Sequence, residues 1–108
     1  MSDHVVAFST ARAADAARIA RELVEHRLAA CVNVVAGVQS TYRWEGKVET
    51  EAEHLLVIKT RRDRLPALKA AFVALHPYEV PELIILPIDD GLPSYLSWLS
   101  ASVVPSPT

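Results

Sequence analysis

A long valine-rich stretch that ends in a tight turn restricts the fold more than any other feature of this chain. Between residues 30 and 42 small apolar side chains occupy alternate positions, as in a β-strand with one apolar face; they are Val32, Val34, Ala36 and Val38. Residues 44–47 (Trp-Glu-Gly-Lys) predict a turn, and residues 49–58 predict the returning strand. The stretch therefore predicts a long β-hairpin, with Gly37 as a bulge or bend.

This hairpin is too long for a domain of its size. At about 3.3 Å per residue, residues 31–44 would extend over on the order of 45 Å. A domain of 108 residues has a radius of gyration of about 13 Å, and hence a diameter of roughly 35 Å. Either the strand breaks at Gly37, or the hairpin projects beyond its own core. A projecting apolar hairpin aggregates unless a neighbouring subunit pairs with it, so we expect a closed homo-oligomer with Val34, Val38 and Trp44 in its interface.

The remaining segments predict two further strands and three helices. The strands are expected at residues 4–8 and 83–86, and the helices at 13–28, from about 63 to 75, and from Pro93 onward. Ser9 or Thr10 is expected to cap the first helix, and Asp63 the second, with Pro66 in its first turn. Two apolar stripes are expected to face the core: Leu65, Leu68, Phe72 and Leu75 in the second helix, and Tyr95, Leu96, Trp98 and Leu99 in the last.

The order β-α-β-β-α-β plus a C-terminal helix is that of an α+β, ferredoxin-like split βαβ fold. We expect one domain over residues 1–108, with residues 104–108 as a frayed tail. Both main helices lie on one sheet face in this fold, and the chain supplies only a short helix for the other. The uncovered face is a second reason to expect a homo-oligomer.

Composition narrows the function classes. A net charge of −2 and 6% aromatic residues argue against nucleic-acid binding. Cys31 is the single cysteine, which excludes an internal disulfide and any CxxC motif. No apolar run reaches the roughly 20 residues needed to span a bilayer. The first residues lack the pattern of a signal peptide, so a cytoplasmic location is expected.

The connector His76–Glu82 is the best candidate site. Pro77 and Pro81 cannot both lie inside a regular element, so the backbone is stiff where an imidazole, a phenol and two carboxylates gather. His76 either contacts a metal or ligand, or caps the last carbonyls of the preceding helix. Glu79 and Glu82 have no activated nucleophile beside them, so we expect no enzyme.

Three other features have two interpretations each. Cys31 is either a small buried residue or a ligand. Trp98, with Tyr95, either clamps the last helix or lines a pocket. The glutamates at 49, 51 and 53 form a solvated row or an intersubunit ion-pair face.

Four motifs in register resemble the CutA family, which is associated with tolerance of divalent cations. The resemblance covers roughly residues 5–103 and rests on Leu28–Asn33, Tyr42–Lys47, His76–Glu82 and Tyr95–Leu99. It implies a ferredoxin-like subunit, a tightly packed homotrimer, an architecture like that of the PII signalling proteins, and a part in tolerance of divalent metals, notably copper.

The resemblance also implies a metal site at His76. Some bacterial members described as copper binders have a cysteine where Ser9 stands here and a second histidine where Leu75 stands. A lone imidazole gives little affinity for Cu(II), so Cu(II) or another divalent cation is expected to bind weakly, with oxygen donors from Tyr78 and nearby carboxylates. Cys31, Tyr78, Glu79 and Trp98 are the residues expected to line an intersubunit cleft.

Three functions follow, in order of preference. The first is a trimeric metal-response protein that binds divalent cations weakly or acts through an unidentified protein partner. The second is a PII-like sensor of a small ligand in the intersubunit clefts, although the chain has no glycine-rich phosphate loop. The third is an enzyme such as a ferredoxin-like phosphatase, which would need a backbone anion cradle that the sequence does not show.

Overall fold

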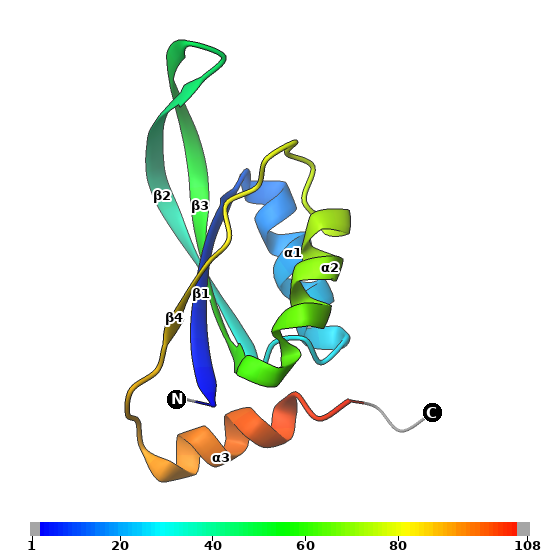
Figure 1. The fold of residues 1–108 in the computed structure, drawn as a ribbon. Coiled ribbons are helices and arrows are strands. Elements are labelled where there is room, and N and C mark those ends of the chain that lie inside the picture. The colour runs from blue at the N-terminus through cyan, green and yellow to red at the C-terminus, as the bar shows by residue number, and fades with distance from the viewer. Residues whose placement is uncertain (1–2, 106–108) are drawn as a thin grey trace.

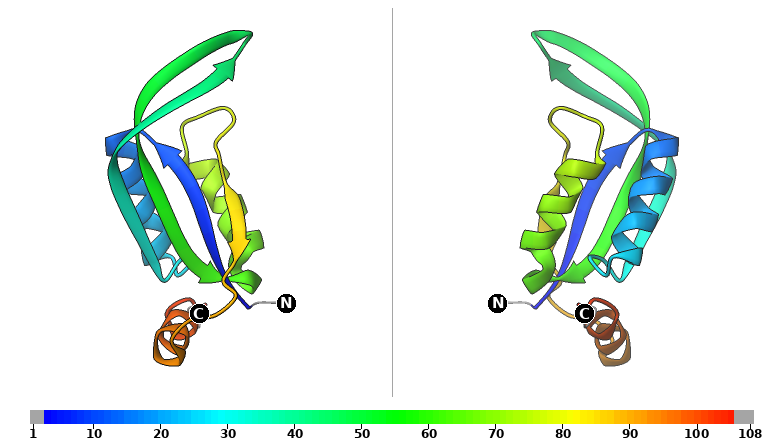
Figure 2. Two further views of the ribbon diagram at one scale, coloured as in Figure 1. Left: turned by 90° about the vertical axis from the view of Figure 1, so that its left-hand side faces the viewer. Right: turned by 90° about the vertical axis from the view of Figure 1, so that its right-hand side faces the viewer.

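A computed structural model describes residues 3–105 of the chain. Within them the elements are, in chain order, β1 (His4–Ala11), α1 (Ala13–Glu25), β2 (Cys31–Trp44), β3 (Lys47–Arg61), the 3-10 turn η1 (Arg62–Arg64), α2 (Leu65–Leu75), β4 (Ile84–Pro87) and α3 (Pro93–Ser102). The strands form one antiparallel sheet in the order β2-β3-β1-β4. Helices α1 and α2 cover one face of it, and α3 crosses one end (Figures 1 and 2). The predicted ferredoxin-like α+β fold is confirmed.

The core lies between the sheet and the two main helices. Alternate residues of β1 are buried, as the two-residue period of a strand requires. The largest fully buried apolar side chains of this core come from both helices and from β3: Phe72, Ile19, Leu23, Leu68, Leu56 and Ile58. The predicted stripe of the second helix is thus confirmed: Leu65, Leu68 and Phe72 are buried, and Leu75 packs against the core.

Helix α1 is shorter than predicted, and it ends at Glu25 rather than near Leu28. Arg27 takes a left-handed conformation with φ of 57°. This turns the chain, and the carbonyl of Leu23 accepts hydrogen bonds from the N–H groups of both Leu28 and Ala29. Such a left-handed residue is a common end for a helix, but glycine is its usual occupant, so an arginine gives no signal in the sequence.

The predicted caps are wrong. Strand β1 runs on through Ser9 and Thr10 to Ala11, so the extended residue before α1 is Arg12, which makes no side-chain cap. Asp63 lies inside η1, and Arg64 precedes α2. Pro66 does occupy the first turn of α2, as predicted.

The long hairpin both bends and projects. The pairing of β2 with β3 shifts between Val35 and Val38, where Gly37 has a φ of 85°, so the predicted bulge is confirmed. Strand β1 covers β3 only as far as His54. Beyond it, β2 and β3 continue alone as a two-stranded arm, which we define as residues 38–53 (Figure 1). The arm gives the molecule its elongated shape, with extents of 44 × 32 × 23 Å.

Helix α3 contacts the rest of the chain along a narrow line. Leu99 is fully buried and packs with Val103 and Ala30. Tyr95 and Trp98, predicted on the buried side, are 41% and 48% exposed. That prediction is wrong within one subunit, because α3 lies across the end of the sheet rather than over its open face (Figure 2). Part of the expected frayed tail, residues 106–108, lies outside the described residues.

Candidate functional site

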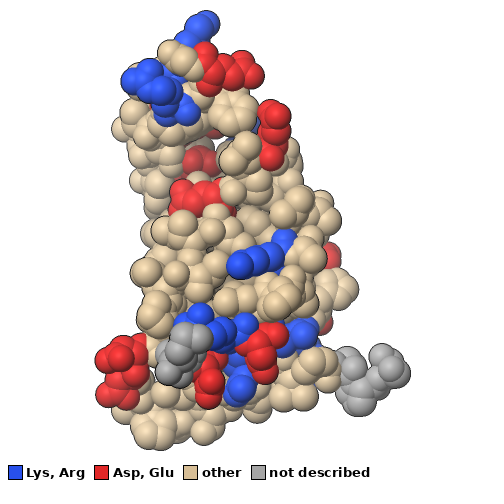
Figure 3. Space-filling view, viewed as in Figure 1, with Lys and Arg blue, Asp and Glu red and all other residues tan. Residues whose placement is uncertain are grey.

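A groove of about 900 Å³ lies between the arm and the connector that follows α2. The end of β1, both strands of the arm and the connector line it: Thr10, Arg12, Ser40, Thr41, Tyr42, Arg43, Trp44, Glu49, Glu51, Glu53, Tyr78, Glu79, Val80 and Glu82. Acidic side chains lie in the hollow below the tip of the hairpin (Figure 3). The structure therefore brings the predicted cleft residues Tyr78 and Glu79 together with the glutamate row of β3.

Glu53 and Tyr78 join the arm to the connector. Strand β1 ends opposite His54, so Glu53 is the first residue of β3 that β1 no longer covers. The Tyr78 hydroxyl fills this place and donates a hydrogen bond of 2.6 Å to the Glu53 carboxylate, which is only 4% exposed. A carboxylate so buried needs such a partner. Burial, and then the bond to Glu53, raise the pKa of Tyr78 well above 10.0, so the phenol keeps its proton.

His76 ties the connector to the end of β1. Its Nδ1 accepts a hydrogen bond from the N–H of Tyr78 at 3.2 Å, so its Nε2 carries the proton and donates to the carbonyl of Thr10 at 2.9 Å. The ring is buried between those of Phe72 and Tyr78, with centroid distances of 5.5 and 4.4 Å. The interpretation that His76 bonds the last carbonyls of its own helix is wrong, because its ring donates to Thr10. The carbonyl of Leu75, at the end of α2, accepts a hydrogen bond from Arg18 instead.

The carboxylates of the groove outnumber its guanidinium groups. Five glutamates line it, against Arg12 and Arg43. Arg12 lies 3.9 Å from Glu51, a loose ion pair. Desolvation, and then the charge of Glu51, raise the pKa of Tyr42. The alternation of the glutamates in the sequence was a usable signal, but only the course of the arm shows that they face the connector.

The described side chains do not form a ready-made metal centre. Within residues 3–105, no three histidine, cysteine, aspartate or glutamate side chains gather closely enough to hold a metal ion. The carboxylates of the groove are spread along it, and both ring nitrogens of His76 bind backbone groups. A metal at His76 must displace one of those bonds, so the residues present do not fit a tightly held resident metal.

The other predicted site residues lie elsewhere. Cys31 begins β2 opposite Lys59, at the end of the sheet far from the arm, and Trp98 lies on α3. One subunit therefore does not bring them to Tyr78 and Glu79. Val34 is exposed on β2, Val38 is half-buried, and Trp44 is exposed at the tip of the arm. The cleft and interface roles of these residues remain predictions.

Comparison with known proteins shows which family model and which relatives the chain matches. Residues 4–102 match the family model described as CutA1 divalent ion tolerance protein. The divalent-cation tolerance protein CutA of Thermus thermophilus is 54% identical over 81 residues, which are 75% of this chain and 79% of that protein. For the protein of the same name from Pectobacterium atrosepticum the identity is 43% over 104 residues, 95% of this chain and 94% of the relative.

A plant relative is longer. The chloroplastic protein CutA 1 of rice is 53% identical over 85 residues, 79% of this chain but 48% of that protein. This chain thus spans about half the length of that relative.

Solved structures agree with the fold. Rice CutA1 superposes with a TM-score of 0.92 at 45% identity, covering 97% of each chain. A Nostoc protein described as the PII-like protein CutA, in its apo form, superposes with a TM-score of 0.88 at 34% identity, covering 94% of this chain and 99% of that one.

Within residues 3–105 no helix is long and apolar enough to cross a membrane.

Proposed function

This chain belongs to the CutA1 divalent ion tolerance family, and on that premise we propose that it is a metal-response protein that binds divalent cations weakly in the groove. The observation that carries the proposal is the lining of five carboxylates against two guanidinium groups. A concave surface of one sign concentrates counter-ions. Carboxylate oxygens suit hard divalent cations, whereas Cu(II) prefers nitrogen and sulfur donors.

Weak binding follows from the state of the groups that could act as donors. His76 is engaged on both ring nitrogens, and the phenol of Tyr78 stays protonated and donates a hydrogen bond to Glu53. Cu(II) at His76, as the family resemblance implies, therefore requires local rearrangement. Because its pKa is raised, Tyr78 stays protonated near neutral pH and offers no phenolate as a base or nucleophile, which supports a binding role rather than an enzymatic one.

We further propose that the groove is completed in a homotrimer. Strands β2 and β4 are the two edges of the sheet and carry exposed apolar side chains, among them Val34, Val35, Ile84 and Leu86. No element of the described chain covers the face of the sheet opposite α1 and α2 (Figure 2). Pairing of the arm with a second copy would protect these edges and bring the Cys31 and Trp98 of one subunit toward another.

A second candidate function is that of a PII-like sensor. The groove also carries Tyr42, Trp44 and Val80, so an organic cation with an apolar part would find both charge and contact surface there. Likeness to the Nostoc protein described as PII-like supports this alternative. A rise in melting temperature with one class of metabolite, and none with metals, would favour it. A cytoplasmic location and an unidentified protein partner remain part of the proposal.

Calorimetric titration of the tag-free protein with Cu(II), and separately with Mn(II), tests the groove. Glu51→Gln removes one charge from the lining, and we expect it to weaken the binding of both ions severalfold. Glu25→Gln is the matched control, because Glu25 lies on α1 outside the groove and pairs with Arg21.

His76→Ala separates the two possible donor sets. Uptake that survives His76→Ala but falls in Glu51→Gln supports the carboxylate groove. Uptake that disappears in His76→Ala and is unchanged in Glu51→Gln would place the metal on the imidazole and overturn the groove.

A further inference from the structure

A second cavity lies at the opposite end of the sheet from the arm. It measures about 770 Å³ and opens between the start of β1, the junction of β3 with α2, and the second half of α3. Its polar side chains are His4, Arg61, Asp63, Arg64, Ser97 and Ser100. The cavity shares no residue with the acidic groove, and the function proposed above does not use it.

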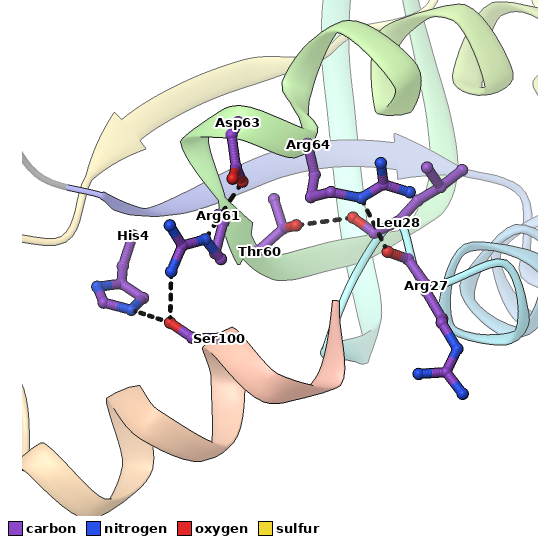
Figure 4. Close-up of polar contacts among 8 residues, drawn as sticks. All are labelled: His4, Arg27, Leu28, Thr60, Arg61, Asp63, Arg64 and Ser100. Carbon is purple, nitrogen blue, oxygen red and sulfur yellow. Dashed lines mark hydrogen bonds and ion pairs between the residues drawn. The ribbon is translucent and has the colours of Figure 1, made fainter. Parts of the chain in front are cut away.

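Hydrogen bonds fix two of the three guanidinium nitrogens of Arg61. His4 and Arg61 are cross-strand partners, so both side chains point to the same face of the sheet, where they converge on Ser100 (Figure 4). Arg61 Nη1 donates to Ser100 Oγ at 3.0 Å, and His4 Nε2 lies 2.8 Å from the same oxygen. Arg61 Nε donates to Asp63 at 3.2 Å. Among residues 3–105, Nη2 of Arg61 makes no hydrogen bond.

Arg64 is held in a similar way by its inner nitrogen. Its Nε donates to the carbonyl of Arg27 at 3.3 Å (Figure 4). That carbonyl is fixed because Arg27 is left-handed and because the buried Thr60 hydroxyl donates to the next carbonyl, that of Leu28, at 2.7 Å. Both terminal nitrogens of Arg64 lack a hydrogen-bond partner within the described part of the chain. They are the donors that a guanidinium presents to a carboxylate.

The rest of the cavity is apolar. Leu96 and Ala101 of α3, with Val103, Val104 and Pro105 after it, form this part. The single carboxylate in the lining, Asp63, already pairs with Arg61. The cavity therefore joins an excess of positive charge to an apolar wall, and its size is within the roughly 300–1,000 Å³ of small-molecule sites.

From this arrangement we propose that the cavity binds a small organic acid, with its carboxylate on the two terminal nitrogens of Arg64, the charge of Arg61 in the same lining, and its short apolar chain against α3. Arg64 is positioned through its Nε, which leaves both of its terminal nitrogens for a ligand, and Arg61 keeps Nη2. Little ordering of these side chains is therefore required on binding. Because the apolar wall includes Leu96 and Ala101 of α3, whereas Arg64 follows β3, a bound acid also fastens α3 to the end of the sheet.

The test is a titration of the full-length protein with hexanoate, followed by NMR of the backbone amides and the arginine Nε–H groups. Saturable shifts are expected at Arg61, Arg64 and Ser100. Arg64→Gln should weaken binding about tenfold, as the loss of a charge-assisted hydrogen bond does. Arg21→Gln, on the exposed side of α1, makes the same change in net charge and should leave binding unchanged. Arg61→Gln is a second variant, to be compared only if its amide spectrum shows α3 still in place.

Three further results decide the matter. Hexanamide, the uncharged analogue, should not bind, and equal binding by it would overturn the role of the arginines. Equal weakening by Arg21→Gln would reduce the effect to net charge and overturn the site. Inorganic phosphate should compete poorly because it cannot use the apolar wall; binding by phosphate tighter than by hexanoate would overturn the carboxylic acid as the ligand class.

Discussion

The same two strands, β2 and β3, lie in two different environments. Where β1 pairs with it, β3 packs on α1 and α2, and residues such as Ile58 are fully buried. In the arm, Val48 is 65% exposed, and the connector contacts the ribbon only near its base, where Tyr78 bonds to Glu53 (Figure 1). A two-stranded ribbon alone is at best marginally stable in water. The helix-covered part is thus self-sufficient, whereas the arm depends on the groove contacts at its base and, by our proposal, on another subunit.

The largest expected effect tests the self-sufficient part. Phe72→Ala removes a fully buried ring between sheet and helices and should lower the free energy of unfolding by about 3–5 kcal/mol. Val48→Ala, a smaller truncation at an exposed position of the arm, should change it by less than about 0.5 kcal/mol. Urea unfolding at one fixed protein concentration measures both values. Equal losses in the two variants would contradict the division of the molecule into these two parts.

A smaller effect is expected where the two parts meet. Tyr78→Phe leaves the buried carboxylate of Glu53 without its donor, which should cost about 1–3 kcal/mol. Tyr95→Phe is the control, because the Tyr95 side chain is exposed and makes no hydrogen bond among residues 3–105. A loss no larger than that of the control would mean that the bond does not hold the arm.

The smallest effect concerns alkaline pH. The pKa of Tyr78 is raised in the folded state, so the unfolded chain releases this proton near pH 10.0 while the folded chain retains it. The contribution of Tyr78 is complete below pH 10.0 and decreases as the pH rises toward the folded pKa. Wild type should therefore lose stability more steeply than Tyr78→Phe between about pH 9.5 and 11, as measured by urea midpoints. Parallel curves would show that the phenol is not perturbed.

The fold could be predicted well from the sequence because the spacing of apolar residues distinguishes strands from helices. Alternating valines, helical stripes and the Trp44–Lys47 turn predicted element order and sheet type. The glycine at position 37 predicted the bulge, and the length of the hairpin predicted either a break there or a projecting arm; the structure has both a bulge and a projecting arm. The errors were at the ends of elements. Arg12 and Arg64 precede the two helices without capping side chains, so no composition rule could locate those starts.

The site was predicted in part. Tyr78 and Glu79 do line a groove, but its other wall is the glutamate row of β3, which sequence spacing could not place. His76 satisfies the carbonyl of Thr10, 66 residues away, and such a partner depends on the tertiary structure. The predicted apolar stripe of the last helix is buried at Leu99, but Tyr95 and Trp98 are exposed in the single subunit. We expect another subunit to bury these two side chains.

The mass of the protein in solution tests the central claim most directly. If the arm and the open sheet face are completed by two further copies, light scattering after size exclusion at micromolar concentration should give three times the 11.8 kDa of the chain. The mass should stay constant on dilution to the detection limit. A particle of 11.8 kDa would contradict the proposed trimer, because the arm and the open sheet face would then have no partner subunit.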